Sequence, residues 1–145
     1  MNIQPDFKEL LKLLKENNVR YMIVGGYAVA WYGHPRFTKD LDIFYHPDAE
    51  NVARLKMTLV QFGFPEEDLG PHLFLPGNIV KMGLEPVRID LLNEIDGVSF
   101  NEAEPDLTEG FYDDIPVQFI GKEALIKNKR ASNRLQDLAD IEKLL

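Results

Sequence analysis

The stretch from Tyr21 to Tyr45 constrains the fold more than any other part of the chain. An apolar run at its start stops at the pair Gly25-Gly26, and a short helix-like piece follows. A glycine and a proline then require a turn, and the chain continues as the alternating sequence Asp40-Leu41-Asp42-Ile43. The predicted order of this unit is strand, glycine turn, helix, loop and strand.

The second strand of this unit carries two carboxylates. Because side chains alternate along a strand, Asp40 and Asp42 point to one face, with their backbones about 6–7 Å apart, and Leu41 and Ile43 point to the other. Hard carboxylate oxygens suit Mg²⁺, which takes one or two carboxylates together with substrate phosphates. The simpler alternative is a strand end with two solvated acids.

The glycine pair is a candidate phosphate-binding turn. Without a Cβ, Gly25 and Gly26 let the backbone approach an anion closely. If the chain is helical from Tyr27 onward, its free amides and its dipole face the same spot. A glycine pair can also be only a tight turn, and the signal gains strength from the acids that follow thirteen residues later.

A third acid lies in a predicted hairpin, whose strands are residues 78–82 and 86–92. In the second strand Asp90 is surrounded by apolar residues, and an acid there is costly to bury without a partner. Either a metal ion or an ion pair with Arg88 or another cation satisfies that requirement.

These motifs together resemble the signature of the nucleotidyltransferase superfamily with the polymerase-beta-like fold. The resemblance rests on Gly25-Gly26, the thirteen-residue gap and Asp40-Leu41-Asp42-Ile43. The segment Arg36-Phe37-Thr38 is similar to small stand-alone members, including those related to AbiEii-type toxins. Gly26 stands where many members have serine, which removes one hydroxyl contact to phosphate. The resemblance covers residues 18–92 well and the C-terminal helix loosely.

The resemblance implies an α/β fold with a small, mixed, twisted sheet and helices mainly on one face. It implies metal-dependent transfer of a nucleoside monophosphate from an NTP, for example ATP, to an acceptor hydroxyl. Asp40, Asp42 and Asp90 would hold two Mg²⁺ or Mn²⁺ ions, and Asp90 could also help to deprotonate the acceptor. The residues implied in nucleotide binding are Gly25, Gly26, Arg36, Thr38, Lys127 and Arg134.

The C-terminal part supplies the one basic patch in the sequence, Lys127 to Arg130. Lys127 and Arg134 resemble the Lys…Arg-x-x-Asp ending of relatives, and the alternative is a solvated helix end. We expect a helix that begins at Lys122, after Gly121, and a final helix from about Ser132 to Leu145, buried through Leu135, Leu138 and Ile141. Upstream, residues 94–115 are predicted to be irregular, and 116–120 to form a strand at a sheet edge because of its proline.

Two further helices are expected as scaffold. Residues 5–16 begin with a proline and an acid and have apolar residues at helical spacing. Residues 48–62 show the same spacing, with Asp48 as a candidate N-cap.

Length and composition set the remaining limits. A chain of 145 residues predicts a single nucleotidyltransferase-like domain over residues 1–145. The absence of cysteine excludes disulfides and thiolate metal sites. No apolar run reaches the roughly 20 residues of a membrane span, and the N-terminus does not read as a signal peptide, so we expect a cytoplasmic protein without a membrane partner.

The acceptor is not specified by any stretch. The net charge of −8 disfavours a broadly basic nucleic-acid surface, although a local basic groove stays open. The acceptor could be an RNA or tRNA end, a protein or a small molecule, and a protein partner or a homodimer could help to present it. The alternative function is a catalytically weak or inactive nucleotide-binding component of a toxin–antitoxin or regulatory complex.

Overall fold

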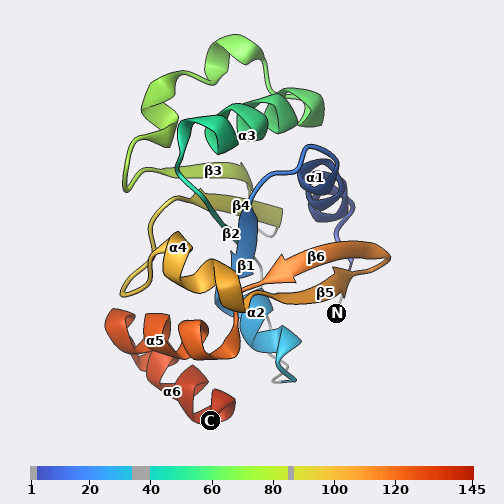
Figure 1. Ribbon diagram of the computed structural model, residues 1–145. Coiled ribbons are helices and arrows are strands. Elements are labelled where there is room, and N and C mark those ends of the chain that lie inside the picture. Colours follow the sequence, from blue (N-terminus) through green and yellow to red (C-terminus); the bar gives the residue numbers. More distant parts are fainter. Residues whose placement is uncertain (1–2, 34–39, 85–86) are drawn as a thin grey trace.

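The computed structural model describes residues 3–33, 40–84 and 87–145 (Figure 1). The α-helices are α1 (Pro5–Glu16), α2 (Gly25–Trp31), α3 (Ala49–Phe62), α4 (Phe100–Ala103), α5 (Lys122–Ser132) and α6 (Leu135–Leu144). The strands are β1 (Tyr21–Val24), β2 (Asp40–Tyr45), β3 (Ile79–Leu84), β4 (Val87–Leu92), β5 (Thr108–Tyr112) and β6 (Ile115–Phe119). Short 3₁₀ turns are η1 (Glu66–Asp68), η2 (Pro71–Phe74) and η3 (Glu104–Asp106).

The strands form a six-stranded mixed sheet in the order β3-β4-β2-β1-β6-β5. β2 runs parallel to β4 and β1 runs parallel to β6. The pairs β1–β2, β3–β4 and β5–β6 are antiparallel. This confirms the predicted α/β fold with a small mixed sheet, the strand–helix–strand unit at its centre and the β3–β4 hairpin.

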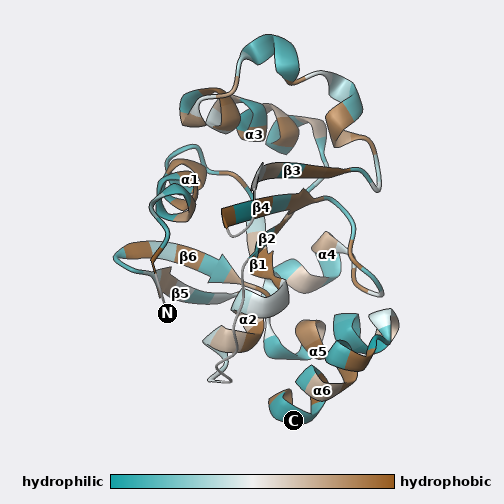
Figure 2. Ribbon diagram, turned by 180° about the vertical axis from the view of Figure 1, so that it is seen from behind, coloured by the Kyte–Doolittle hydropathy of each residue, from teal (hydrophilic) through white to brown (hydrophobic). Residues whose placement is uncertain are grey.

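Helices lie on both sides of this sheet. α1 and α3 lie beside each other, across the sheet from α4, α5 and α6 (Figure 1). Figure 2 shows hydrophobic colours along β3 and part of β4, with hydrophilic segments in β4, β5 and β6. None of the helices in the described ranges has both the length and the hydropathy that crossing a membrane requires.

The two scaffold helices are confirmed. The buried face of α1 consists of Phe7, Leu10, Leu11 and Leu14, as the spacing predicts. Asp48 caps α3, and its side chain accepts a hydrogen bond of 2.7 Å from the backbone N–H of Asn51.

Residues 94–115 are not irregular throughout, which corrects the prediction. They contain α4, η3 and β5. The start of α4 is set by a capping box, in which the Ser99 hydroxyl accepts from the Glu102 N–H and the Glu102 carboxylate accepts from the Ser99 N–H. This serine and glutamate, three residues apart, were a readable signal that the acidic composition obscured.

The predicted edge position of the strand around Pro116 is wrong, because β6 lies between β1 and β5. The proline is tolerated there because the β1–β6 ladder is short. Its one Cα pair is Ile23 with Phe119, so Pro116 lies outside the ladder and its missing N–H breaks no bond in it.

The two helices expected after Gly121 are present as α5 and α6, and the second begins at Leu135 instead of at about Ser132. Asn133 adopts a left-handed conformation, with φ of 54°, and separates α5 from α6. Leu135 is 88% exposed and Leu138 is 46% exposed, so only Ile141 of the three predicted core residues is buried. The inward face of α6 instead carries two aspartates whose partner lies on α5.

Candidate active site

The three predicted acids come together because β2 and β4 are parallel neighbours. In their register Asp42 lies beside Asp90, and Asp40 lies beside Arg88. Alternation then places all four side chains on one face of the sheet. Side chains at directly paired positions of neighbouring strands are close enough to interact, so the acids form one cluster.

Gly25 packs directly against this cluster. β1 ends at Val24, which pairs with Asp42, and Gly25 follows with a φ of +69°. A Cβ at Gly25 would clash with Oδ2 of Asp42. Glycine is therefore required twice, for its backbone conformation and for the space beside the carboxylate. Gly26 is buried in the first turn of α2.

The cluster concentrates negative charge in a partly desolvated place. Burial and, after it, the carboxylates of Asp90 and Asp40 together raise the pKa of Asp42 from 3.8 to about 7. Arg88 and Lys129 act in the opposite direction but do not cancel the rise. An added cation at this position would relieve the repulsion.

Arg88 is the cation that the acids contact. Its Nη2 lies 2.9 Å from Oδ2 of Asp40, and its Nε lies 3.2 Å from Oδ1 of Asp90. The ion pair between Asp90 and Arg88 that the sequence left as an alternative is therefore present. That Arg88 also reaches Asp40 was not predictable from the sequence, because this contact depends on the strand register.

The acids supply the oxygen donors that a divalent ion prefers, but Arg88 lies against two of them. Oδ1 of Asp40 and Oδ1 of Asp90 are buried and accept no hydrogen bond from any residue in the described ranges. Such oxygens retain lone pairs that a hard cation can use. As the side chains stand, the described residues bring no three His, Cys, Asp or Glu groups close enough together to hold a metal. Arg88 lies between two of the three carboxylates that a metal would need.

The two predicted C-terminal cations, Lys127 and Arg134, have different ion-pair partners. Lys127 is exposed, and its Nζ lies 3.0 Å from Glu102. Arg134 binds Asp137, with Nε 2.8 Å from Oδ2. The electrostatic influence of Asp42 reaches Arg134 and contributes to the raised pKa of its guanidinium, which the hydrogen bond to Asp137 raises most. Arg36 and Thr38 lie outside the described residues.

Lys129 was missed by the sequence reasoning. Its side chain is 6% exposed, and its Nζ lies 3.3 Å from Asp137 and 3.1 Å from Asp140, both buried on α6. It also lowers the pKa of Asp42, so it acts on the acid cluster. The available signal was helical spacing: Lys129 follows the buried Leu125 by four positions, on the inward face of α5.

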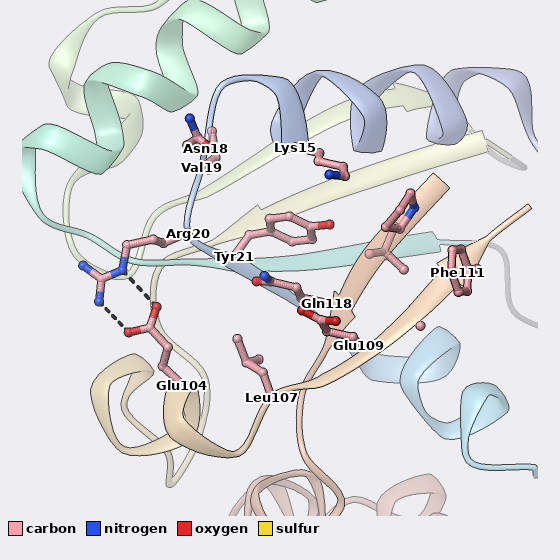
Figure 3. A pocket seen from close by; sticks show the side chains of 13 residues that line it. Lys15, Asn18, Val19, Arg20, Tyr21, Glu104, Leu107, Glu109, Phe111 and Gln118 are labelled. Carbon is pink, nitrogen blue, oxygen red and sulfur yellow. Dashed lines mark hydrogen bonds and ion pairs between the residues drawn. The ribbon is translucent and has the colours of Figure 1, made fainter. Parts of the chain in front are cut away.

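A cavity of about 670 Å³ lies away from the acids (Figure 3). It is bounded by the end of α1, the start of β1, the β5–β6 hairpin and η3. Figure 3 shows Arg20 and Glu104 paired at its rim, with a distance of 2.6 Å between Nη2 and Oε1. The acids lie at the other end of β1, beside Val24.

Comparison with known proteins identifies the family. The aminoglycoside-2''-adenylyltransferase family profile matches residues 6–128. The chain belongs to this family. It is a nucleotidyltransferase, and its resemblance to that superfamily is confirmed, whereas the closer likeness to AbiEii-type toxins is not supported. No curated protein matches the chain in sequence.

Solved structures share the fold of this adenylyltransferase family member. The lincosamide antibiotic adenylyltransferase LnuA, bound to lincomycin, has a TM-score of 0.64 at 19% identity, over 99% of this chain and 98% of its own. ANT(2'')-Ia in complex with adenylyl-2''-tobramycin has a TM-score of 0.60 at 15% identity, over 95% and 84%. An antigenic nucleotidyltransferase-like protein from Paracoccidioides brasiliensis has a TM-score of 0.56 at 14% identity, over 98% and 77%.

Proposed function

We propose that this protein transfers AMP from ATP to a hydroxyl group of an aminoglycoside. The observation that carries the proposal is the family match over residues 6–128. The acceptor class also agrees with the charge of the chain, since 24 acidic residues against 16 basic ones favour a polycationic small molecule over RNA. A homologous fold is known with adenylyl-2''-tobramycin bound.

In the proposed reaction the acceptor oxygen attacks the α-phosphorus of ATP. A new oxygen–phosphorus bond forms, the bond from the α-phosphorus to the bridging oxygen of the β-phosphate breaks, and pyrophosphate leaves. The acceptor proton passes to a carboxylate, which we assign to Asp90. Its burial and its place in β4 beside Asp42 hold the carboxylate in position for this transfer.

Asp40, Asp42 and Asp90 are the proposed ligands of Mg²⁺ or Mn²⁺. A bound ion would neutralise phosphate charge and make the acceptor hydroxyl easier to deprotonate. Gly25 and Gly26 are proposed to bring backbone amides to the β- and γ-phosphates. The proposed cations around the nucleotide are Arg36, Lys127 and Arg134, with Thr38 as a further contact, and of these, Arg134 is under the electrostatic influence of Asp42.

The test is an acceptor panel. The protein is incubated with ATP, Mg²⁺ and either tobramycin, lincomycin or total RNA, and pyrophosphate release and the mass of the acceptor are measured. We expect tobramycin to gain the mass of one AMP, in step with pyrophosphate. Adenylylation of lincomycin or RNA, with tobramycin unchanged, would overturn the aminoglycoside proposal.

A further inference from the structure

Arg88 bridges two of the three carboxylates in the acid cluster. One nitrogen, Nη2, lies 2.9 Å from Asp40 and 3.2 Å from Oδ2 of Asp90, and Nε lies 3.2 Å from the other oxygen of Asp90. The guanidinium is a planar group whose N–H donors match carboxylate and phosphate oxygens equally well. Its position is defined by the register that pairs Asp40 with Arg88.

The contacts of Arg88 use oxygens that a divalent ion would need. A metal bound by the cluster would have to take at least one oxygen from Asp40 and one from Asp90. The oxygens of these two residues that accept no hydrogen bond are buried beside the guanidinium. Two cations cannot share this small group of oxygens without strong repulsion, so one must displace the other.

Arg88 is also partly exposed to solvent, which would allow its side chain to move away from the acids. Its side chain is 31% exposed, against 27% for Asp40 and 11% for Asp90, so part of the arginine reaches solvent although its Nε is buried. Once released from the acids, its guanidinium would be able to pair with a phosphate oxygen of a nucleotide bound at the same cluster.

We propose that Arg88 is an internal counter-ion that holds Asp40 and Asp90 in the metal-free protein and passes to the nucleotide phosphates when a divalent ion binds. This inference rests on the proposed metal site. Arg88 is a positioning residue in the first state and a substrate-binding residue in the second.

The test measures Mn²⁺ binding without nucleotide, by calorimetric titration or by the EPR signal of free Mn²⁺. It compares the wild type with Arg88→Met and with Lys81→Met. Lys81 pairs with Asp90 across β3 and β4 and is exposed, and no ion pair is found for it in the part of the chain that the structure describes. Lys81→Met therefore removes the same charge near the cluster without removing a contact to it.

We expect Arg88→Met to bind Mn²⁺ about tenfold more tightly than the wild type, because a competing cation is gone. Lys81→Met should change the Kd by less than about threefold. In EDTA, Arg88→Met should melt at a lower temperature than the wild type, and Mn²⁺ should restore it. With Mn²⁺ present, the same variant should lose affinity for ATP and retain its affinity for AMP.

Equal Mn²⁺ affinity for the wild type and Arg88→Met, with Mn²⁺-dependent transfer intact, would overturn the counter-ion inference and leave the proposed function standing. If none of the three proteins binds Mn²⁺, the counter-ion inference and the proposed metal-dependent function are both contradicted. Should Arg88→Met not fold in EDTA, Arg88→Lys replaces it. A lysine retains the positive charge but lacks the planar set of N–H donors of the guanidinium, so this variant should show an intermediate gain in Mn²⁺ affinity. An unchanged Kd would overturn the inference.

Discussion

At the scale of single residues, the identities of the acids and of the glycine pair followed from the sequence, because alternation along a strand and the absence of a Cβ are local properties. The contact between Gly25 and Asp42 was not predictable in the same way. It depends on how β1 and β2 pair, and pairing is a long-range property. The same applies to the two-sided contact of Arg88.

The first prediction concerns pH and the metal-free protein. The pKa of Asp42 rises from 3.8 to about 7 on folding, so between these values the folded protein binds more protons than the unfolded chain. The free energy of unfolding in EDTA should therefore fall as pH rises from about 4 to about 7. Urea unfolding across this range measures it, and Asp42→Asn should remove this part of the fall. The same slope in both proteins would contradict the assignment.

The second prediction compares two glycines of positive φ. Gly25→Ala should destabilise the fold by more than Gly33→Ala, because a Cβ at Gly25 meets Asp42 whereas one at Gly33 meets no described atom within 4 Å. Both changes share the strain of a left-handed backbone, about 1–2 kcal/mol. The difference between their urea midpoints isolates the contact with Asp42. Equal midpoints would mean that Gly25 serves only the turn.

At the scale of elements, helices α1 and α3 and the β3–β4 hairpin were predictable from periodicity and caps. The break at Asn133 lies next to the predicted start of the final helix at Ser132. The burial of Lys129 was not predictable, because a basic run of this kind is typical of a solvated helix end. Lys129 is buried within that run because the inward face of α6 offers two aspartates, Asp137 and Asp140. A charged residue on a buried face is identified only when its partner is known.

The third prediction tests this pairing. Lys129→Met should lower the free energy of unfolding by about 3–5 kcal/mol, because it removes the buried cation that Asp137 and Asp140 share, although Asp137 keeps its ion pair with Arg134. Lys127→Met, two positions away and paired with an exposed Glu102, should cost about 1 kcal/mol or less. Urea denaturation of both variants decides it, and similar losses would contradict a special role for Lys129.

At the scale of the whole molecule, the mixed sheet and the superfamily were predictable because the motif from Gly25 to Ile43 contains both the central strands and the proposed chemistry. The acceptor was not predictable, since no local pattern in the 145 residues encodes it. The proposal of an aminoglycoside comes from the family match. The central claim is that Asp90 serves the reaction and is not only a partner of Arg88.

That claim is tested most directly by Asp90→Asn, with transfer of AMP to tobramycin and the urea midpoint measured on the same preparation. The account predicts that transfer falls by at least about 100-fold. The midpoint should stay the same or rise, because an asparagine still accepts from Arg88 while repulsion with Asp42 disappears. Retained transfer together with a large loss of stability would mean that Asp90 is structural, and would contradict the account.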